Sequence, residues 1–573
     1  MQIIPRYTAP ELGRRILRAA RSTSFAALAV YVVLALAATY PFLLSPHNTM
    51  TAPLASDFTS SVTVYGAYID SGADPFTARR INSVAQPDGL PNSIGVNRVS
   101  ALSVLYLWLG SLVVGPIMAH SLETFLGYVL TAFVMFLLVK RVTRSPGAAF
   151  VAGLIYGFWP LMLGLGRAEP TYTHMWLYLL PIWAFWELVN DPRKKRVILA
   201  AASILPAMYW TPYFAFHILL VGASCLLVAL LFLRERLGAA KALLLAGGFI
   251  VSWALACAMY YAVGVAGSTA SDIPTRTAAE AYQQSAHPLM YVLPGESSVL
   301  GKNANDLLVR LVPRAAHTSL YVGLSVLALA AFGFICSLKT RGGKRSSATW
   351  VASVMCATVA LCCFAFSLAP TITLAGHTIA TPNDLVIKAV PALRAGQRLV
   401  MPLMGALAAL AGVGAYFALR QVHGRWKYLL LAGLVGLVGV DLWSPYDDSS
   451  TKVVASPAIV ALKDLPSGRV AQYRLSSLVG YPAQVSCLAQ EVHRQPIIND
   501  CGLFRSAASP AMPTPQLAKL VALPLCQQLQ GMRLLDVRYV IVEKNDRPVL
   551  DCLRAHNDTE PILQDSTYKI FRL

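Results

Sequence analysis

Residues 51–98 read TAPLASDFTSSVTVYGAYIDSGADPFTARRINSVAQPDGLPNSIGVNR, and this polar stretch separates the first apolar segment of the chain from the next one. Prolines and glycines divide it into short pieces, and its acids are Asp57, Asp70, Asp74 and Asp88. A long polar loop between membrane spans is either a functional surface held by the helices or a solvated connector. The topology of the whole chain favours a functional surface, in a first outer loop at residues 45–98.

The composition describes a membrane protein rather than a soluble one. The chain has 573 residues, a mean hydropathy of +0.55 and only 13% charged residues. Its net charge of +19 would suit a nucleic-acid partner, but the basic residues fall in short clusters between apolar stretches. Such clusters mark the inner side of a membrane protein. We therefore expect a lipid bilayer around the chain and no nucleic-acid partner.

Apolar segments that are long enough, or nearly long enough, to cross a bilayer recur along the chain. They lie near residues 24–44, 120–139, 147–165, 175–190, 197–210, 213–233, 242–264, 318–338, 348–368, 399–419 and 428–443. A further segment, 101–117, is ambiguous, and we interpret it as a helix that lies on or dips into the outer leaflet. With that choice every inner segment is basic, which predicts a polytopic α-helical membrane protein with about eleven transmembrane helices, an inner N-terminus and an outer C-terminus.

The chain changes character after residue 444. RVAQYRLSSLVGY and LLDVRYVIVEK alternate like strands, and Leu517–Leu529 is helix-like with a break expected at Pro524. This predicts a membrane domain at residues 1–444 and an extracytoplasmic α+β domain at residues 445–573. The cysteines of this second domain are Cys487, Cys501, Cys526 and Cys552. Proximity favours the disulfides Cys487–Cys501 and Cys526–Cys552, although three pairings are possible, and zinc is the less favoured interpretation.

Asp57 is the best candidate for a general base. It follows the first apolar segment by about a dozen residues, so it can lie at the outer face of the membrane. An acid there could take a proton from an acceptor hydroxyl. The alternative is that Asp57 is the N-cap of a helix beginning near Phe58, and both roles can hold together.

Two later outer segments carry further candidates. GLGRAEPTYTHMW packs Arg167, Glu169 and His174 between two spans, where ionisable residues suggest function. Glu169 is a candidate second acid or metal ligand, and the alternative is an interfacial Arg167–Glu169 pair. AVPALRAGQRLVMP places Arg394 and Arg398 four residues apart, a spacing that suits a phosphate clamp if helical, although two solvated interfacial arginines are the alternative.

These features together resemble the GT-C superfamily of integral-membrane glycosyltransferases. The resemblance lies in the opening span, the long outer loop with its acid in LASD, and the run SGADPFTARRINSVAQPDGLP, which is similar to a G-x-x-P-F…P-x-G pattern. That pattern belongs to a bacterial branch related to proteins that glycosylate lipoteichoic acid and other envelope polymers. LVKRVTRSPGAAFVAGLIYGFWP, AVPALRAGQRLVMP and LLDVRYVIVEK also look like this branch, so the resemblance covers nearly the full length.

The resemblance implies a polyprenyl-phosphate-linked sugar donor, a glycan, lipid or protein acceptor, and a bacterial inner membrane with the C-terminal domain in the periplasm. It implies that Asp57 is the base and that Glu169 is the second-loop acid. Arg167, His174, Arg394 and Arg398 would bind substrate. The family often shows paired acids and a divalent metal, Mg or Mn, but Phe58 follows Asp57 here, which leaves metal dependence open.

Two functions of other classes remain as alternatives. A transporter or flippase of lipid-linked sugars would show internal repeats and charged residues in mid-span, whereas the sequence has no convincing repeat and the interior of the spans is nearly free of charge. A non-catalytic scaffold for envelope assembly would use the C-terminal domain. Replacement of Asp57 by Asn distinguishes the enzyme from both.

Overall fold

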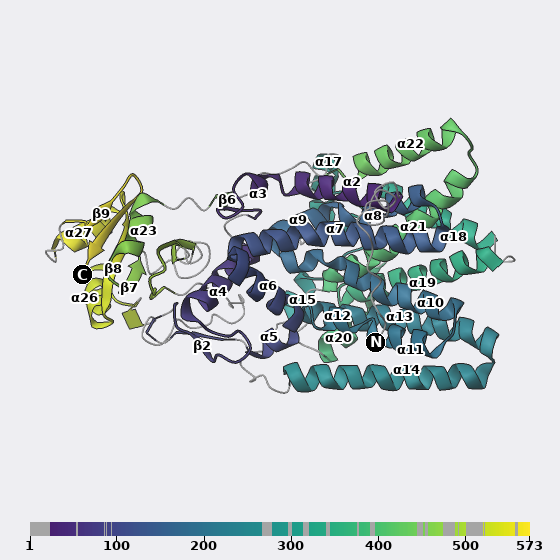
Figure 1. The fold of residues 1–573 in the computed structure, drawn as a ribbon, viewed down its shortest axis with the longest axis horizontal. Helices are drawn as coiled ribbons and strands as arrows, with labels where there is room; N and C mark the ends of the chain where they lie inside the picture. Colours follow the sequence, from purple (N-terminus) through teal and green to yellow (C-terminus); the bar gives the residue numbers. More distant parts are fainter. Residues whose placement is uncertain are drawn as a thin grey trace, which may run out of the picture.

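The molecule is an elongated bundle of helices with a smaller sheet-containing unit at one end (Figure 1). The computed structural model describes residues 23–52, 56–84, 86–87, 89–92, 94–265, 278–295, 301–312, 320–339, 344–374, 377–389, 396–443, 451–452, 456–473, 488–490, 492–499, 519–520, 522–555 and 560–573. The bundle holds the membrane-spanning helices, and the first outer loop lies between the bundle and the C-terminal unit (Figure 1).

Five described helices are long and apolar enough to cross a membrane, so the chain is a multi-pass membrane protein. They are α7 (Pro116–Thr143), α13 (Pro212–Leu237), α14 (Ala239–Tyr260), α19 (Lys344–Ser367) and α21 (Val400–Arg420). The pair α8 (Pro146–Gly157) and α9 (Pro160–Ala168), bent by 45°, makes a sixth candidate. The predicted number of about eleven is not confirmed, because the helices at the other predicted spans are shorter.

These shorter elements still fall where apolar segments were predicted. They are α2 (Thr23–Ala38), η2 (Met175–Tyr178) with α10 (Leu179–Asn190), α11 (Lys194–Ala202), α12 (Leu205–Met208), α18 (Leu324–Lys339) and α22 (Arg425–Asp441). Pro206, in the first turn of α12, marks the break between α11 and α12. The sequence therefore located the helices of this region better than it predicted their lengths.

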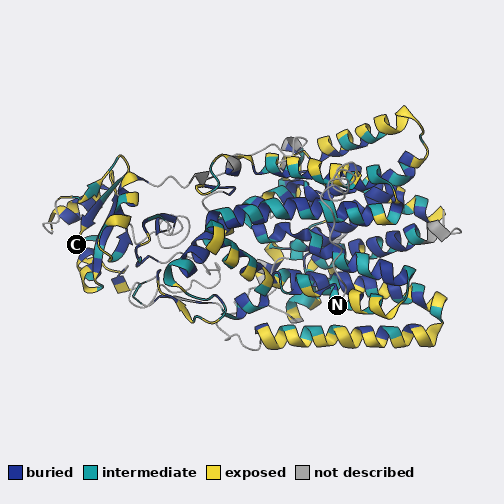
Figure 2. Ribbon diagram, in the orientation of Figure 1, coloured by how far each residue is buried: buried dark blue, intermediate teal, exposed yellow. Residues whose placement is uncertain are grey.

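Helix α21 lies at the centre of the bundle and packs against α8, α18 and α19. Gly333 of α18 and Gly414 of α21 let these two helices approach closely, because a methyl group at either position would overlap backbone atoms of the other helix. Helices α14 and α22 lie at the margin and expose large apolar side chains (Figure 2). Such side chains suit contact with lipid rather than with water.

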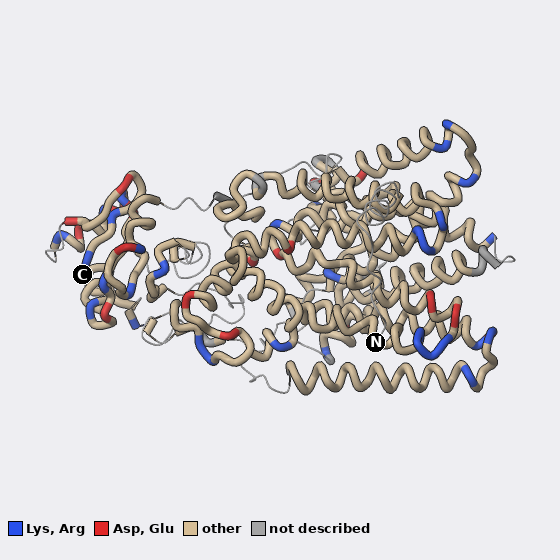
Figure 3. Tube along the Cα trace, viewed as in Figure 1, with Lys and Arg blue, Asp and Glu red and all other residues tan. Residues whose placement is uncertain are grey.

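Lys and Arg gather at the end of the bundle farthest from the C-terminal unit (Figure 3). The last turns of α7, α13, α18 and α21 contribute Lys140, Arg141, Arg234, Arg236, Lys339 and Arg420. Glu187 of α10 pairs there with Arg141 at 3.0 Å and with Arg196 at 2.9 Å. The basic clusters that fall within the described residues thus share one side of the molecule.

The first outer loop is an ordered surface, and the solvated-connector interpretation is wrong for its described residues. It forms α4 (Asp57–Ser71), the paired strands β2 (Arg80–Ile81) and β3 (Leu90–Pro91), and α5 (Ile94–Val99). Asn92 and Asn97 hold it together: the Tyr68 hydroxyl donates to Asn92 at 2.6 Å, and Asn97 donates to the Pro75 carbonyl at 2.7 Å. A loop with its polar groups satisfied in this way can carry a site.

Helix α6 (Ala101–Val114) is the ambiguous segment of the sequence. It has 14 residues, too few to cross a bilayer. One face is buried through Ser103, Val104 and Leu107, whereas Leu109 and Val113 are exposed. This fits the predicted helix on the membrane surface.

The remaining described elements of the membrane part are short. They are α3 (Tyr40–Leu44), β1 (Thr49–Met50), η1 (Pro170–Thr173), η3 (Tyr261–Val265), α15 (Ala278–Gln283), α16 (Leu289–Val292), α17 (Lys302–Leu311), the hairpin β4 (Thr371–Leu374) and β5 (His377–Ala380), α20 (Pro382–Ala389) and η5 (Gly396–Leu399). Strand β1 pairs with β6 (Thr451–Lys452), so the first loop and the start of the C-terminal unit are joined by backbone hydrogen bonds.

The C-terminal unit, called the tail domain below, contains a four-stranded sheet in the order β7-β8-β10-β9. Its strands and helices are β7 (Arg469–Gln472), β8 (Val537–Glu543), β9 (Leu563–Gln564), β10 (Tyr568–Arg572), α23 (Pro457–Ala461), η6 (Leu462–Asp464), α26 (Leu525–Leu534) and α27 (Arg547–Ala555). Strands β7 and β8 are parallel, and the other pairs are antiparallel. Helix α26 begins directly after Pro524, where the sequence predicted a break.

A disulfide joins Cys526 of α26 to Cys552 of α27, with 5.1 Å between their Cα atoms. This confirms the predicted Cys526–Cys552 pair. Cys487 and Cys501 lie outside the described residues, as does the predicted domain boundary at 444/445, so both stay predictions.

Candidate active site

Asp57 is the first residue of α4, and the cap of that helix is the residue before it. The Ser56 side chain accepts a hydrogen bond from the Thr59 backbone N–H at 3.3 Å. The interpretation of Asp57 as the N-cap is therefore wrong, because Ser56 already fills that role. Within the described part of the chain, the exposed Asp57 carboxylate makes no hydrogen bond or ion pair. It is free to take a proton from a bound hydroxyl.

Glu169 stands at the elbow where α9 ends and η1 begins. Its backbone N–H donates to the Leu165 carbonyl at 2.7 Å, and Pro170 then stops the helix. Helix α7 holds this elbow: Thr124 donates to the Gly166 carbonyl at 3.0 Å, and Thr131 donates to the Thr173 carbonyl at 2.9 Å. The acid thus sits on a rigid bend rather than on a free loop.

Arg398, in η5 at the start of the α21 span, reaches this elbow. One terminal nitrogen, Nη2, donates to both oxygens of Glu169 at 2.6 and 2.7 Å, and Nη1 donates to the Tyr172 hydroxyl at 2.5 Å. The guanidinium carbon lies 4.4 Å from the centre of the Tyr172 ring and 4.5 Å from that of Tyr213. A charge-assisted pair and two aromatic rings therefore hold one cation. We call Glu169, Tyr172, Tyr213 and Arg398 the arginine cluster.

Asp57 acts on the same cluster. Burial raises the pKa of the Tyr172 phenol well above its ordinary value, Arg398 opposes this, and the carboxylates of Glu169 and Asp57 raise the pKa further. Asp57 therefore lies within electrostatic range of Tyr172. Arg398 begins the span that ends at Arg420, so it lies at the end of the bundle opposite the basic one. The fold brings Asp57 and Glu169, from two other parts of the chain, to the same end.

The other predicted site residues are placed differently. His174 is buried: it accepts a hydrogen bond from Trp176 Nε1 at 3.0 Å, and its ring lies 4.4 Å from that of Trp210. Burial lowers the pKa of His174 to about 3, so its ring is neutral. Arg167 is half-buried in the last turn of α9. Arg394 lies outside the described residues.

Sequence reasoning missed Tyr172, Tyr213 and Glu123. The two tyrosines carry no local signal of contact with an arginine that is distant in the sequence. Glu123, in α7, is fully buried, and neither of its carboxyl oxygens has a hydrogen-bond partner among the described residues. A single acid inside an apolar helix is a signal that could have found it.

The described residues do not fit a divalent metal ion at Glu169. Both of its oxygens already accept hydrogen bonds from Arg398, a cation. In the described ranges no three His, Cys, Asp or Glu side chains gather closely enough to bind a metal. Mg²⁺ takes several oxygen ligands, and the described residues around Glu169 do not supply them.

A family model described as "Domain of unknown function (DUF6311)" matches residues 26–443. Among curated proteins, none matches the chain.

Two solved structures show a distant likeness. ArnT from Cupriavidus metallidurans, bound to undecaprenyl phosphate, has a TM-score of 0.48 and 12% identity over 95% of this chain and 97% of ArnT. The oligosaccharyltransferase AglB from Archaeoglobus fulgidus, in complex with an inhibitory peptide and a dolichol-phosphate, has a TM-score of 0.44 and 11% identity over 91% of this chain and 69% of AglB.

Proposed function

The chain belongs to the DUF6311 family, and we propose that it is a membrane glycosyltransferase of GT-C type, which moves a hexosyl or pentosyl group from a polyprenyl-phosphate-linked donor to an envelope glycan, lipid or protein. One observation carries this proposal. Asp57 is exposed, makes no hydrogen bond or ion pair within the described part of the chain, and lies within electrostatic range of Arg398, a cation that Glu169 and two tyrosine rings hold in place. A base and a phosphate-binding cation are the two groups that such a transfer needs.

The step is an inverting displacement. Asp57 takes the proton of an acceptor hydroxyl, whose oxygen forms a bond to the anomeric carbon of the donor sugar. The bond from that carbon to the phosphate oxygen breaks, and the lipid phosphate leaves with the electron pair. Its negative charge grows as the bond breaks, and Arg398, with Arg394 as a second candidate, stabilises it. Glu169 and the two tyrosines orient Arg398.

Arginine suits this role better than lysine. Its guanidinium keeps its charge, forms two parallel hydrogen bonds to a phosphate and stacks on aromatic rings. Arg398 and Glu169 are about one-fifth exposed, with side-chain accessibilities of 21% and 20%, so the pair borders solvent rather than lying in the protein core. An incoming phosphate can therefore reach the guanidinium.

The distribution of charge supports an outer, periplasmic site in a bacterial inner membrane. The basic end of the bundle would face the cytoplasm by the positive-inside rule. Lys140 at that end donates to Ser24 at 2.7 Å, which places the start of α2 there and favours a cytoplasmic N-terminus. The cluster and the tail domain lie at the other end, and a disulfide is suited to an oxidising compartment.

Replacement of Asp57 tests the proposal. The full-length chain in proteoliposomes is supplied with undecaprenyl-phosphate-linked glucose, mannose or arabinose, labelled in the sugar, and with envelope extract from a strain lacking the chain. Asp57→Asn should lower transfer about 100-fold or more while protein yield is unchanged, because the amide cannot take the proton.

Asp74→Asn is the matched control. Asp74 lies in the same loop and accepts hydrogen bonds from Phe76 N–H at 2.9 Å and the Thr77 hydroxyl at 2.8 Å, so it is a turn residue, and its variant should transfer normally. Full transfer by Asp57→Asn would refute the enzyme proposal and favour the flippase or the scaffold.

A further inference from the structure

Helix α4 carries the proposed base at one end and meets the tail domain at the other. Asp57 is its first residue, and Asp70 lies in its last turn. A rise of 1.5 Å per residue separates these two residues by about 20 Å. Because an α-helix is stiff over this length, a shift of the Asp70 end also moves Asp57.

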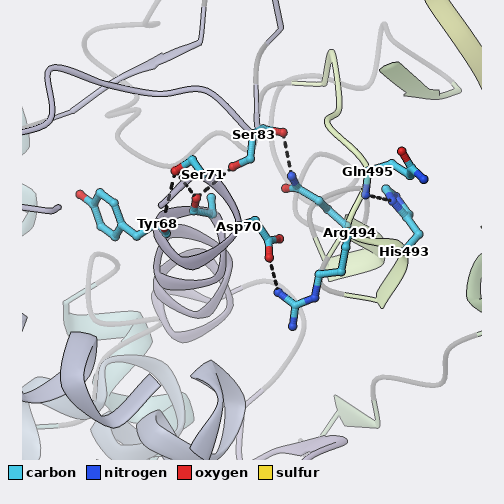
Figure 4. A network of polar contacts seen from close by, with 9 residues as sticks. Tyr68, Asp70, Ser71, Ser83, His493, Arg494 and Gln495 are labelled. Atoms are coloured by element: carbon cyan, nitrogen blue, oxygen red, sulfur yellow. Dashed lines mark hydrogen bonds and ion pairs between the residues drawn. The ribbon is translucent and has the colours of Figure 1, made fainter. Parts of the chain in front are cut away.

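An ion pair fastens the Asp70 end. Arg494 of the tail domain donates from Nη1 to Asp70 Oδ1 at 2.6 Å, and the Asp70 side chain is only 11% exposed (Figure 4). The Arg494 backbone has φ of 57°, in the left-handed region, where glycine is usual. A larger residue keeps this conformation only where the surrounding structure determines it. The surrounding structure thus holds Arg494 in an unfavourable backbone conformation, and from this position its side chain reaches α4.

Backbone pairing beside the ion pair joins the two parts further. The Ile497 N–H donates to the Ser83 carbonyl, and the Gln86 N–H donates to the Ile497 carbonyl, both at 3.0 Å. Gln490 also donates to the Ser83 carbonyl at 2.7 Å. The Ser83 hydroxyl in turn donates to the Ala67 carbonyl of α4 at 3.0 Å. These hydrogen bonds therefore hold the tail domain in one position relative to the first loop.

Apolar contacts extend along both halves of α4. Tyr65 and Tyr68 lie in one core cluster with Val470, Ile497 and Tyr539 of the tail domain. Nearer to Asp57, Phe58 and Val62 share a second cluster with Leu488. The tail domain and the first loop thus have a common core, and α4 is the helix that runs through it.

The membrane bundle holds α4 from the other side. His120 Nε2 of α7 lies 2.7 Å from the Ser61 hydroxyl, one turn after Asp57. The rings of Phe58 and Tyr65 lie 5.6 and 5.4 Å from that of His120. Helix α4 is therefore clamped between α7 and the tail domain, and its position depends on both.

The ion pair contributes orientation more than net stability. Burial raises the pKa of Asp70, and the nearby Arg494 offsets this only in part. A half-buried ion pair of this kind adds little to the stability of the fold, because the cost of removing both charges from water cancels much of their attraction. It does, however, favour one relative position of the two helices or loops that carry it. The apolar clusters supply most of the free energy that holds the tail domain against α4. Arg494 and Asp70 define the position in which the two parts meet.

We propose that Arg494 is a positioning residue for sugar transfer: through Asp70 it sets the position of α4 and hence of the Asp57 carboxylate. The tail domain is then a part of the catalytic unit rather than a separate cap. This inference rests on the proposed glycosyltransferase function, and its experiment tests the two separately.

The experiment compares Arg494→Gln with Arg494→Lys in the proteoliposome assay with undecaprenyl-phosphate-linked sugars. Arg494→Gln should lower kcat about 10- to 100-fold with little change in KM for the donor, since a misplaced base slows the chemical step. Arg494→Lys keeps the charge and should restore most of the rate. Hydrogen exchange of the backbone amides of residues 58–61 should quicken in Arg494→Gln and not in Arg494→Lys.

Arg554→Gln is the control, because Arg554 makes an exposed tail-domain pair with Asp551 at 3.1 Å and lies on α27. Arg554→Gln should leave both kcat and the hydrogen exchange of residues 58–61 unchanged. If Arg494→Gln is not recovered in folded form, Asp70→Asn carries the same test with the same expected loss. A normal transfer rate in these variants, when Asp57→Asn is inactive, would overturn the positioning role. Normal transfer by Asp57→Asn would instead refute the proposed function.

Discussion

Glu169 accepts two hydrogen bonds from one nitrogen of Arg398, at 2.6 and 2.7 Å, although 229 positions separate these residues in the chain. The pair joins the elbow after α9 to the start of the α21 span. The sequence analysis assigned separate roles to these residues, with Glu169 as a second acid and Arg398 as part of a phosphate clamp. In the structure they form one ion pair. Its partners Tyr172 and Tyr213 add two aromatic faces to the same guanidinium.

Arg398→Lys should lower sugar transfer about 100-fold, because an ammonium cannot stack between two rings and bind phosphate through two parallel hydrogen bonds. Arg420→Lys, an exposed position at the far end of the same helix, is the control and should transfer normally. Initial rates with undecaprenyl-phosphate-linked sugars measure both. Equal rates for the two variants would remove Arg398 from the mechanism.

Gly166→Ala should displace the elbow that carries Glu169. A methyl group at position 166 would overlap the Tyr128 hydroxyl, whereas a methyl group at Gly164, in the same helix, meets no atom within 4 Å. We expect Gly166→Ala to cost about 1–3 kcal/mol and Gly164→Ala to be neutral or slightly stabilising. Thermal unfolding midpoints in detergent compare the two, and similar midpoints would contradict the close packing of the elbow on α7.

Removal of the Cys526–Cys552 disulfide should destabilise the tail domain. The bridge closes a loop with a sequence separation of 26, for which chain entropy predicts a loss of roughly 3–4 kcal/mol. A Cys526→Ala/Cys552→Ala variant should melt at a lower temperature than the parent protein. Reductant should lower the midpoint of the parent and leave that of the variant unchanged; a parent insensitive to reductant would argue against the bridge.

His493 should make the tail domain sensitive to acid. Burial and the neighbouring Arg494 lower the pKa of His493 to about 3, from an ordinary value near 6.5. The unfolded chain therefore binds a proton more readily, so stability is full above about pH 6.5 and is lost as the pH falls toward 3.

His493→Asn should flatten this loss. Its amide oxygen can replace the Nδ1 atom that accepts from the Gln495 N–H at 3.0 Å, but it does not titrate. Unfolding midpoints of the tail domain between pH 4 and 7 provide the measurement. If the parent protein and the variant lose stability equally steeply as the pH falls, titratable groups other than His493 cause the loss.

Local patterns in the sequence predicted much of the architecture. Apolar runs located the helices, basic clusters marked one end of the bundle, Pro524 marked the start of α26, and proximity selected Cys526–Cys552. Each of these predictions depends on a few neighbouring residues or on overall composition, so it can be made without knowledge of the tertiary structure. Helix lengths were less predictable, since packing and proline breaks decide where a helix in an apolar run ends.

The sequence by itself determined that the chain is a multi-pass membrane protein with an acid in the long loop after its first apolar segment. Only the tertiary structure decided that Ser56 rather than Asp57 caps α4, that Glu169 pairs with Arg398 between two tyrosines, and that Arg494 of the tail domain reaches Asp70. The physical reason is the range of the interactions. Solvation of apolar segments is a sum over adjacent residues, whereas a hydrogen bond or ion pair needs two atoms within about 3 Å, and only the packed fold brings distant residues that close.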